Sequence, residues 1–370
     1  MLIKSVEADK EARIIAISDI HGYADYLKGV LKKVAYTPRD VLVIVGDAIE
    51  KGTESLKTAR AILKLRQENP HVYLTAGNVD YTRVGKFFQD SPQGNADFLK
   101  NLKWTERVWR KGFFLDILAE MKVTLEEVTE QNIAAIKKQM WENYAQEIGL
   151  FVNLPVILSI GDYIFVHGGI PTDDLEQLKE EDMFSYLSRD AFLQESVAFQ
   201  KNVVVGHWPV CLYRDDVDSM NPIFDYEKHK VAIDGGCGLK YGAQLNALVI
   251  PQAYADLRDV TCAAYDDLPV MKAKKAQAAK ERTVTIRYFD YMVELLEDFG
   301  DMARVRHVSS GKEFMVPKKF LYHREGKFFD CADFSDTYLE VAEGEKLSVV
   351  WETSMGLIVK KQGVIGWYCP

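Results

Sequence analysis

Residues 14–22 read Ile-Ile-Ala-Ile-Ser-Asp-Ile-His-Gly, and this stretch decides the fold. A short apolar run of this kind is typical of a buried strand. The run leads into Asp19 and His21, whose side chains at near-extended spacing can point into one cleft, and Gly22 permits a sharp turn. An acid and an imidazole so close together are candidate ligands of a divalent metal ion. Taken alone, the same letters are also compatible with an ordinary strand-to-helix turn.

Composition limits the classes of protein to which this chain can belong. It has 370 residues, 48% hydrophobic and 11% aromatic, which is enough for two or three domains with full cores. The net charge of −9 argues against sequence-independent nucleic-acid binding, which depends on basic side chains that neutralise phosphates. The charged N-terminus is unlike a signal peptide, and no apolar run approaches the ~20 residues of a membrane span. Five scattered cysteines without a C-x-x-C pair indicate reduced thiols, so we expect a soluble, cytoplasmic protein.

Strands and helices alternate in the first part of the chain. Apolar runs predict buried strands at 14–17, 41–45 and 72–76, and apolar residues at helical spacing predict a helix after each of the first two. The order β-α-β-α-β indicates a largely parallel sheet with right-handed crossovers. In such sheets functional groups gather beyond the carboxyl ends of the strands. The ends of these strands are therefore where a site is expected.

Five predicted strands, which begin near 14, 41, 72, 163 and 203, all finish in residues that can bind a metal ion. Chance placement of five such endings is improbable. Three oxygen donors and three imidazoles suffice for two ions that share one bridging carboxylate. This mixed set suits Mn²⁺, Fe, Zn²⁺ or Ni²⁺ better than Ca²⁺ or Mg²⁺, and Mn²⁺ is favoured. The candidate metal ligands are Asp19, His21, Asp47, Asn78, His167 and His207.

Three further segments complete the predicted organisation. Residues 95–150 carry a capping-box spacing and a helical pattern, which predicts a helical insertion, either a cap beside the cleft or plain helical packing. Residues 269–282 are charged and poor in apolar residues, as in a linker or an exposed helix. Short alternating segments in 283–370 predict a small β-barrel. The domains expected are thus 1–268 and 283–370.

The ordered motifs resemble the calcineurin-like metallophosphoesterase superfamily. They are Asp-x-His-Gly, Gly-Asp-x-x-x-x-Gly, Gly-Asn-x-Asp, Val-His-Gly-Gly and Gly-His-Trp, within about 12–251. Gly-His-Trp and the late Asp-Gly-Gly-Cys favour the phosphoprotein-phosphatase branch, which includes the symmetrical diadenosine tetraphosphatases. The resemblance implies an α/β (α+β) fold, a β-sandwich flanked by helices, with two metal ions. The end of the chain resembles bacterial Src-homology-3-like domains.

By the matching motifs, one ion takes Asp19, His21 and Asp47. The second takes Asp47, Asn78, His167 and His207, so that Asp47 is the bridge. The resemblance further implies that Asp47, Lys51 and Asn78 are catalytic, with two metal ions that clamp a phosphoryl oxygen and activate a water for in-line displacement.

Two departures from the family pattern bear on the reaction. The family has His after the Asn, where it protonates the leaving oxygen, but this chain has Val79. Glu50 stands for the Asp that orients that His, and Lys51 for a phosphate-gripping Arg whose two-pronged geometry a Lys cannot reproduce. A general acid typically contributes ~10²–10⁴ in rate, so its loss penalises poor leaving groups most. We therefore expect a preference for phosphodiesters, phosphoanhydrides or activated esters.

Two functions stay open at this point. The first is a phosphoesterase acting on a phosphorylated small molecule or nucleotide. The second is a weak or inactive pseudophosphatase, a binding or scaffold protein that uses the C-terminal barrel for a protein partner or self-association. Candidate substrate contacts are Lys51, Arg83, Trp208 and Tyr241. A surface ion pair is the alternative role for Arg83, and core packing is the alternative for Tyr241. Cys237 is expected to be a small buried residue beside the cleft.

Overall fold

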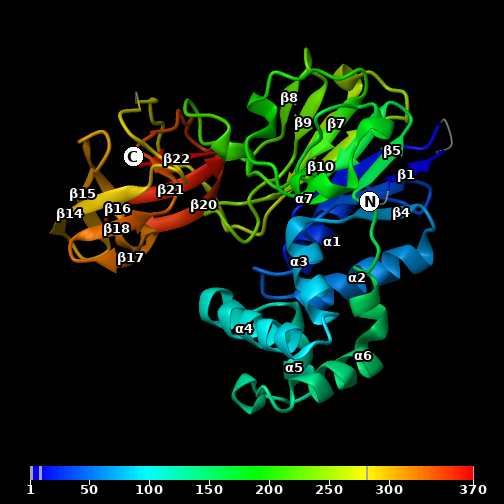
Figure 1. Cartoon of the computed structure of the whole chain (residues 1–370). Helices are drawn as coiled ribbons and strands as arrows, with labels where there is room; N and C mark the ends of the chain where they lie inside the picture. Colours follow the sequence, from blue (N-terminus) through cyan, green and yellow to red (C-terminus); the bar gives the residue numbers. More distant parts are fainter. Residues whose placement is uncertain (1–2, 8–10, 281, 370) are drawn as a thin grey trace. The chain divides into compact units, whose positions relative to one another are not determined.

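The computed structural model describes residues 3–7, 11–280 and 282–369 (Figure 1). Its described part divides into two compact units. Unit 1 comprises 1–209, 222–238 and 245–265, and unit 2 comprises 210–221, 239–244 and 266–370. Each unit has a core of its own, so each is described separately.

The first sheet of unit 1 carries the stretch that decides the fold. Its order is β11-β10-β2-β3-β4, and β2, β3 and β4 run parallel. β10 lies antiparallel to both of its neighbours. The strands are β2 Ile14–Ile17, β3 Val41–Val45, β4 Val72–Thr75, β10 Leu245–Ile250 and β11 Thr261–Tyr265.

The second sheet of unit 1 has the order β1-β5-β6-β7-β9-β8. Its central strands β6, β7 and β9 are parallel, so they too end at a common edge. The strands are β1 Ile3–Val6, β5 Ile157–Ile160, β6 Tyr163–Val166, β7 Asn202–Val205, β8 Ile223–Asp225 and β9 Lys230–Ala232.

The two sheets pack face to face, and alternation along β2 shows why every residue of that strand is apolar. Ile14 and Ala16 belong to the core shared with the second sheet, which includes Phe165 and Val204. Ile15 and Ile17, which point to the other face of the sheet, pack against the helices instead. Because side chains alternate between faces and both faces are covered, all four residues of β2 are buried.

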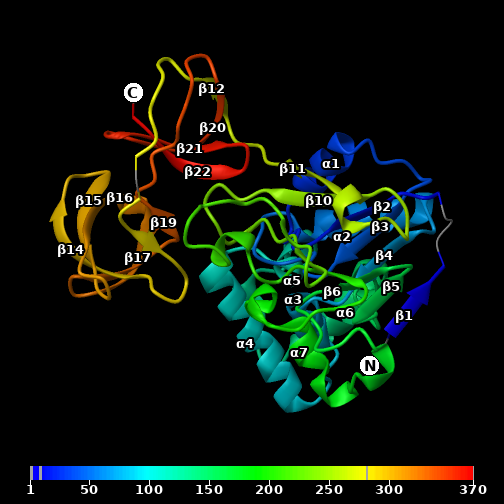
Figure 2. The same ribbon diagram turned by 90° about the horizontal axis from the view of Figure 1, so that it is seen from above.

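Helices cover the other face of the first sheet and form the insertion (Figure 2). The helix α4 begins after Ser91, whose side chain accepts the Gly94 N–H, and the predicted capping box of Thr124 and Glu127 caps a 3-10 turn. The helices are α1 Ala24–Lys33, α2 Ser55–Glu68, α3 Asn78–Phe87, α4 Pro92–Trp109, α5 Phe113–Glu120, α6 Ile133–Gly149 and α7 Met183–Leu187. Short 3-10 turns lie in unit 1 at Leu125–Glu127, Leu175–Gln177, Glu180–Asp182, Phe192–Gln194 and Leu257–Asp259, and in unit 2 at Val210–Leu212 and Lys318–Phe320. None of the described helices is both long and apolar enough to cross a bilayer.

Unit 2 is built from short antiparallel strands. One sheet has the order β16-β15-β14-β18-β17, a second has β12-β20-β21-β22, and β13 pairs with β19. The strands are β12 Val270–Lys272, β13 Thr285–Ile286, β14 Met292–Asp298, β15 Met302–His307, β16 Glu313–Pro317, β17 Leu321–Glu325, β18 Phe328–Cys331, β19 Phe334–Ser335, β20 Lys346–Thr353, β21 Gly356–Lys361 and β22 Val364–Tyr368.

This architecture confirms the predicted fold class, an α/β sandwich flanked by helices followed by a curled all-β region. The packing differs from the predicted boundaries in two places. Strand β12 lies within the segment predicted to be a linker or exposed helix, because Val270–Lys272 pairs with β20. The loops 210–221 and 239–244 also pack with unit 2, although they lie inside the predicted first domain.

Candidate metal centre

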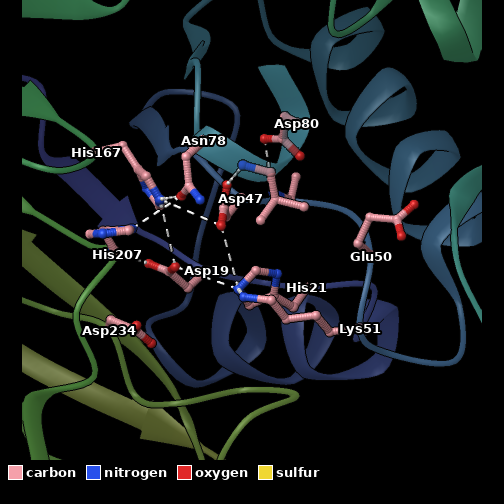
Figure 3. A network of polar contacts seen from close by, with 12 residues as sticks. Asp19, His21, Asp47, Glu50, Lys51, Asn78, Asp80, His167, His207 and Asp234 are labelled. Carbon is pink, nitrogen blue, oxygen red and sulfur yellow. Dashed lines mark hydrogen bonds and ion pairs between the residues drawn. The ribbon is translucent and has the colours of Figure 1, made fainter. Parts of the chain in front are cut away.

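The six side chains predicted as metal ligands lie together at the carboxyl ends of the parallel strands of unit 1 (Figure 3). Asp19 and His21 follow β2, Asp47 follows β3, and Asn78 opens α3 after β4. From the second sheet, His167 follows β6 and His207 follows β7. Both sheets of the sandwich therefore contribute to one cluster.

Asp47 lies in the middle of this cluster. Its Oδ2 is 3.6 Å from His21 Nε2 and 3.5 Å from His167 Nε2. Its Oδ1 accepts the Val79 N–H at 2.9 Å, which fixes the carboxylate plane. Two ligand atoms that share an ion at about 2.1 Å lie roughly 3.0–3.5 Å apart, so a carboxylate between two imidazoles suits a bridging role.

Asp19 completes a first group of donors. Its Oδ1 is 3.6 Å from His21 Nε2, and single ligand atoms of Asp19, His21 and Asp47 all lie within 4.8 Å of one another. All three residues are buried. The three side chains form a compact set with two carboxylates and one imidazole.

A second group forms around Asn78. Its Oδ1 is 3.1 Å from both His167 Nε2 and His207 Nδ1. Because Asn78 and His207 are partly exposed, solvent reaches the cluster on this side.

Each imidazole has one nitrogen occupied by the protein and one left toward the cluster. His167 Nδ1 lies 2.9 Å from the Val45 carbonyl oxygen, and His21 Nδ1 lies 3.2 Å from that of Ile49. For His207 the order is reversed, with Nε2 at 3.1 Å from Asp190. A hydrogen bond at one ring nitrogen selects the tautomer whose other nitrogen is free to bind a metal ion.

The backbone at the cluster is held in an unusual conformation. Four of the six side chains stand on residues with positive φ: Asp19 at 51°, His21 at 48°, Asp47 at 49° and His207 at 65°. The left-handed region costs a non-glycine residue roughly 1–2 kcal/mol. Such strain persists where the surrounding structure over-determines it, and it concentrates at functional sites.

Two glycines make room for the carboxylates. A Cβ on Gly206 would lie 2.2 Å from Asp19 Oδ2, and one on Gly77 would lie 2.1 Å from Asp47 Oδ1. Any side chain at either position would therefore push a candidate ligand out of place.

Burial and mutual charge shift the pKa values of the cluster strongly. Burial alone would lower the pKa of His167, but the Asp47 and Asp19 carboxylates beside it raise the pKa to about 10. Burial would raise the pKa of Asp47, but His167 and His21 bring it far below its usual range. The carboxylates thus require a positive charge among them, supplied by the His167 proton when no cation is bound.

The pKa values of the other two histidines and of Asp19 shift in the directions opposite to those of His167 and Asp47. Burial and the Lys51 charge lower the pKa of His21 to about 3, and burial and His167 lower that of His207 to about 4. Burial and the nearby Asp234 raise the pKa of Asp19 well above its usual range. Two of the three imidazoles are therefore neutral, which is the form that binds a metal ion.

Asp80 is a buried acid that we did not predict as part of the site. Its two oxygens accept the N–H groups of Ala48 and Ile49 at 3.1 and 3.2 Å. It thereby holds the loop that follows β3 and carries Asp47. Burial and the nearby Asp47 charge raise its pKa to about 7. The Gly-Asn-x-Asp motif contained this residue, but its role became visible only from the hydrogen bonds.

Lys51 lies at the cluster, with its Nζ 2.8 Å from His21 Nε2 (Figure 3). The ammonium thus stands beside the nitrogen that His21 offers for a metal ion. Glu50 and Lys51 have φ of 71° and 65°, so the turn that carries them is also strained. Val79, where the resemblance of the motifs implies a histidine, donates its backbone N–H to Asp47 Oδ1.

Glu50 turns away from the cluster (Figure 3). Its Oε1 accepts the Phe113 N–H at 2.9 Å, and its Oε2 lies 3.6 Å from Arg83 Nε. The Arg83 guanidinium also lies over the Trp104 ring at 5.1 Å. Arg83 is therefore engaged by Glu50 and Trp104, which favours its alternative role as an ion-pair partner.

The remaining candidates are distributed differently. Trp208 is buried directly after His207, and Cys237 is buried in the helix-side core. Tyr241 lies in unit 2, where its ring stacks on Phe320 at 4.1 Å. Of the two roles considered for Tyr241, the structure favours core packing.

The model of the calcineurin-like phosphoesterase family matches residues 12–233, which carry β2 to β9 of the two sheets of unit 1 and all six candidate ligands. The chain belongs to the calcineurin-like phosphoesterase family. This family implies divalent metal ions, and the donor set of carboxylates, a carboxamide and imidazoles fits such ions, because each imidazole keeps one nitrogen for them.

Individual relatives agree with the predicted branch. A symmetrical bis(5'-nucleosyl)-tetraphosphatase of Shewanella frigidimarina is 39% identical over 89 residues, which are 23% of this chain and 32% of that protein. The match thus spans about a third of the length of that curated relative.

Two solved structures are similar to part of the chain. A putative diadenosine tetraphosphatase has a TM-score of 0.44 and 17% identity, with 72% of this chain and 99% of that one covered. A protein serine/threonine phosphatase of Saccharomyces cerevisiae has a TM-score of 0.45 and 13% identity, with 72% and 84% covered.

Proposed function

We propose that this calcineurin-like phosphoesterase hydrolyses phosphodiester, phosphoanhydride or activated phosphate ester bonds with two divalent ions, Mn²⁺ being favoured. One ion is held by Asp19, His21 and Asp47, and the other by Asp47, Asn78, His167 and His207. Support comes from the position of Asp47 Oδ2, which is almost equally far from His21 and His167.

When bound, the ions supply Lewis acidity and lower the pKa of a water molecule, so that it attacks phosphorus at neutral pH. The protein's part is to hold the donors rigidly. The Val79 N–H fixes Asp47, the Asp80 carboxylate fixes the loop that follows β3, and the Val45 carbonyl orients His167. Pre-organised donors need no rearrangement during the reaction.

The observation that carries substrate choice is the absence of a proton donor at residue 79. The Val79 side chain has no ionisable proton to donate. Glu50, which would orient a histidine at that position, is engaged with Arg83 and Phe113. An alkoxide leaving group needs a proton badly, whereas an aryl oxide or a phosphate released from an anhydride does not. We therefore infer that good leaving groups are preferred.

Lys51 is the cation proposed to bind the substrate phosphate. Its ammonium lies against His21 Nε2, and a metal ion bound at that nitrogen would repel it. A single ammonium binds phosphate as a point charge, without the two-pronged grip of arginine. Lys51 should therefore distinguish between substrates more by the charge of the phosphate group than by its shape.

The relative from Shewanella frigidimarina, by its name, acts on bis(5'-nucleosyl) tetraphosphates, which are phosphoanhydrides. A nucleotide of this kind meets the leaving-group requirement, so we propose a nucleotide-type substrate.

The structure joins none of the five cysteines, all in its described part, in a disulfide. This agrees with our proposal of a cytoplasmic protein. The curled all-β region remains a proposed surface for a protein partner or self-association.

The decisive experiment compares three substrates with the Mn²⁺-loaded protein: bis-p-nitrophenyl phosphate, diadenosine tetraphosphate and phosphoserine, a monoester whose leaving group is an alkoxide. We expect faster turnover of the diester or the anhydride than of the monoester. Faster monoester cleavage would contradict the leaving-group argument.

Two variants serve as controls for that assay. Asp47→Asn weakens the proposed bridge and should abolish turnover, whereas Lys103→Ala, at an exposed position of α4, should leave it unchanged. A metal-loaded protein that turns over none of the three substrates would instead support the pseudophosphatase alternative.

A further inference from the structure

Asp234 follows a third parallel strand whose end lies at the same edge as the cluster. His167 follows β6, His207 follows β7, and Asp234 follows β9 two residues beyond Ala232. The pairing of Val205 with Ala232 places Asp234 level with His207 when the register is continued by two residues. The topology therefore gives Asp234 the same relation to the site as two of the candidate ligands.

The Asp234 carboxylate is buried and only half satisfied. Its exposed fraction is 1%, and its Oδ1 accepts the Gly236 N–H at 2.7 Å. Its Oδ2 is buried with no hydrogen-bond donor among the described residues. Leaving a buried charged oxygen without a partner is costly, so such an oxygen in a native site calls for an unseen ligand.

The surroundings of Asp234 identify the charge of that ligand. Figure 3 shows Asp234 near Asp19, at the edge of the cluster. Both carboxylates are buried, Asp19 with 2% and Asp234 with 1% of its surface exposed. Two buried carboxylates that repel each other are stabilised together by a cation between them.

We propose that Asp234 is a seventh donor of the metal centre, and that its Oδ2 binds the ion held by Asp19, His21 and Asp47, directly or through a water of that ion. This inference rests on the metal centre of the proposed function, but not on any reaction. Asp234 adds a third carboxylate to Asp19 and Asp47, and so supplies further negative charge to balance two divalent ions.

The test is a Mn²⁺ titration of the metal-free full chain by calorimetry and by the electron paramagnetic resonance signal of free Mn²⁺. In Asp234→Asn, the amide keeps the acceptor for Gly236 N–H but presents an NH₂ where Oδ2 was. We expect one of the two ions to bind roughly 10–100-fold more weakly, with the other little changed. The metal-free variant should also unfold at the same or a higher temperature, because an unpaired buried charge is gone.

Asp40→Asn is the matched control. Asp40 is equally a buried aspartate of unit 1, but it lies just before β3, at the opposite end of that strand from Asp47, and pairs with Arg13 and Thr37. This variant should lower the unfolding temperature and leave Mn²⁺ affinity unchanged. Loss of affinity in both variants would mean that general destabilisation is responsible and would overturn the proposal.

Unchanged Mn²⁺ binding in Asp234→Asn would also overturn the proposal that Asp234 is a donor of the metal centre. A second measurement does not depend on the variant: the anomalous signal of Mn²⁺ in crystals of the loaded wild-type chain. We expect Asp234 Oδ2 on an ion or on its water; a direct Asp234–Lys51 ion pair with no metal contact would refute the assignment. Every readout in this test measures ion binding or ion position. A chain that binds two ions, one of them through Asp234, but shows no turnover would therefore refute only the proposed function.

Discussion

The Val79 backbone N–H donates to Asp47 Oδ1 at 2.9 Å, so the residue that lacks a proton-donating side chain still positions the proposed bridging carboxylate. The backbone of Val79 positions Asp47, whereas its side chain determines whether a proton can be donated to the leaving group. These two effects can therefore be separated by substitution. Substitutions at this position should therefore change substrate choice and leave the metal centre in place.

We expect Val79→His to raise turnover of alkyl phosphate monoesters, whose leaving group needs a proton, by about tenfold, with the aryl diester rate little changed. A well-oriented general acid is worth ~10²–10⁴, but Glu50 faces Arg83 and so leaves the new imidazole poorly oriented. Steady-state kinetics on matched monoester and diester substrates would measure this. Val79→Thr, similar in size but unable to act as the acid, should change neither rate, and a gain in that variant would contradict the argument.

Gly206→Ala should weaken Mn²⁺ binding at least tenfold and destabilise the chain, because the new Cβ would lie 2.2 Å from Asp19 Oδ2 and 2.8 Å from the Ser18 side chain. Metal titration and thermal unfolding measure the two effects. Gly85→Ala is the control, since no atom lies within 4 Å of a Cβ there and the residue is within α3. It should keep full affinity and gain about 0.5–1 kcal/mol of stability. Equal behaviour of the two variants would show that Asp19 is not a ligand.

Metal affinity should rise with pH. The raised pKa values of His167, about 10, and of Asp19 mean that the metal-free protein holds protons that an ion must displace. Each displaced proton makes the observed affinity rise about tenfold per pH unit below the pKa concerned. Calorimetry in two buffers of different ionisation enthalpy would count the protons released at pH 7, and we expect at least one.

The same shift predicts how the metal-free form responds to pH. Because the folded pKa of His167 lies above the value of about 6.5 in an unfolded chain, its contribution to stability is complete below pH ~6.5. That contribution is lost as the pH rises through 10. Thermal unfolding of metal-free protein between pH 6.5 and 10 should show this decline. His167→Gln should flatten the curve, and an unaltered slope would contradict the assignment.

Arg83→Ala should cost about 2–3 kcal/mol in the free energy of unfolding, because Glu50 would stay buried without its counter-charge. If Arg83 acts only as this partner, the KM for the diester is unchanged in the folded variant. The double variant Glu50→Gln with Arg83→Ala should recover part of the stability. A large rise in KM with normal stability would reinstate Arg83 as a substrate contact.

Much of the site could be predicted because strand ends are local signals. Apolar runs that stop at an acid, an amide or an imidazole gave Asp47, Asn78 and His167 without knowledge of the pairing. Asp234 follows the same signal after 231–233, but it was not grouped with the others, because only the register of β9 beside β7 places it level with His207. The hydrogen bonds of Asp80 are likewise tertiary and leave no trace in spacing.

The fold was predictable in class, and less so at its edges. Strands such as β1 and β8 are short and partly exposed, so periodicity does not distinguish them from loops. Strand β12 was missed because Val270–Lys272 opens a charged stretch and owes its conformation to pairing with β20. Tyr241 follows a motif loop in the chain yet packs in unit 2, a separation that sequence adjacency conceals.

The left-handed backbone at Asp19, His21, Asp47 and His207 has a consequence for protein engineering. Directed evolution for heat resistance alone would reward glycine or asparagine at these four positions, since those residues relieve the backbone penalty. Every such gain would remove a group proposed to hold the cofactor. A library screened for survival at high temperature should thus enrich durable but inert clones, unless cofactor retention is selected at the same time.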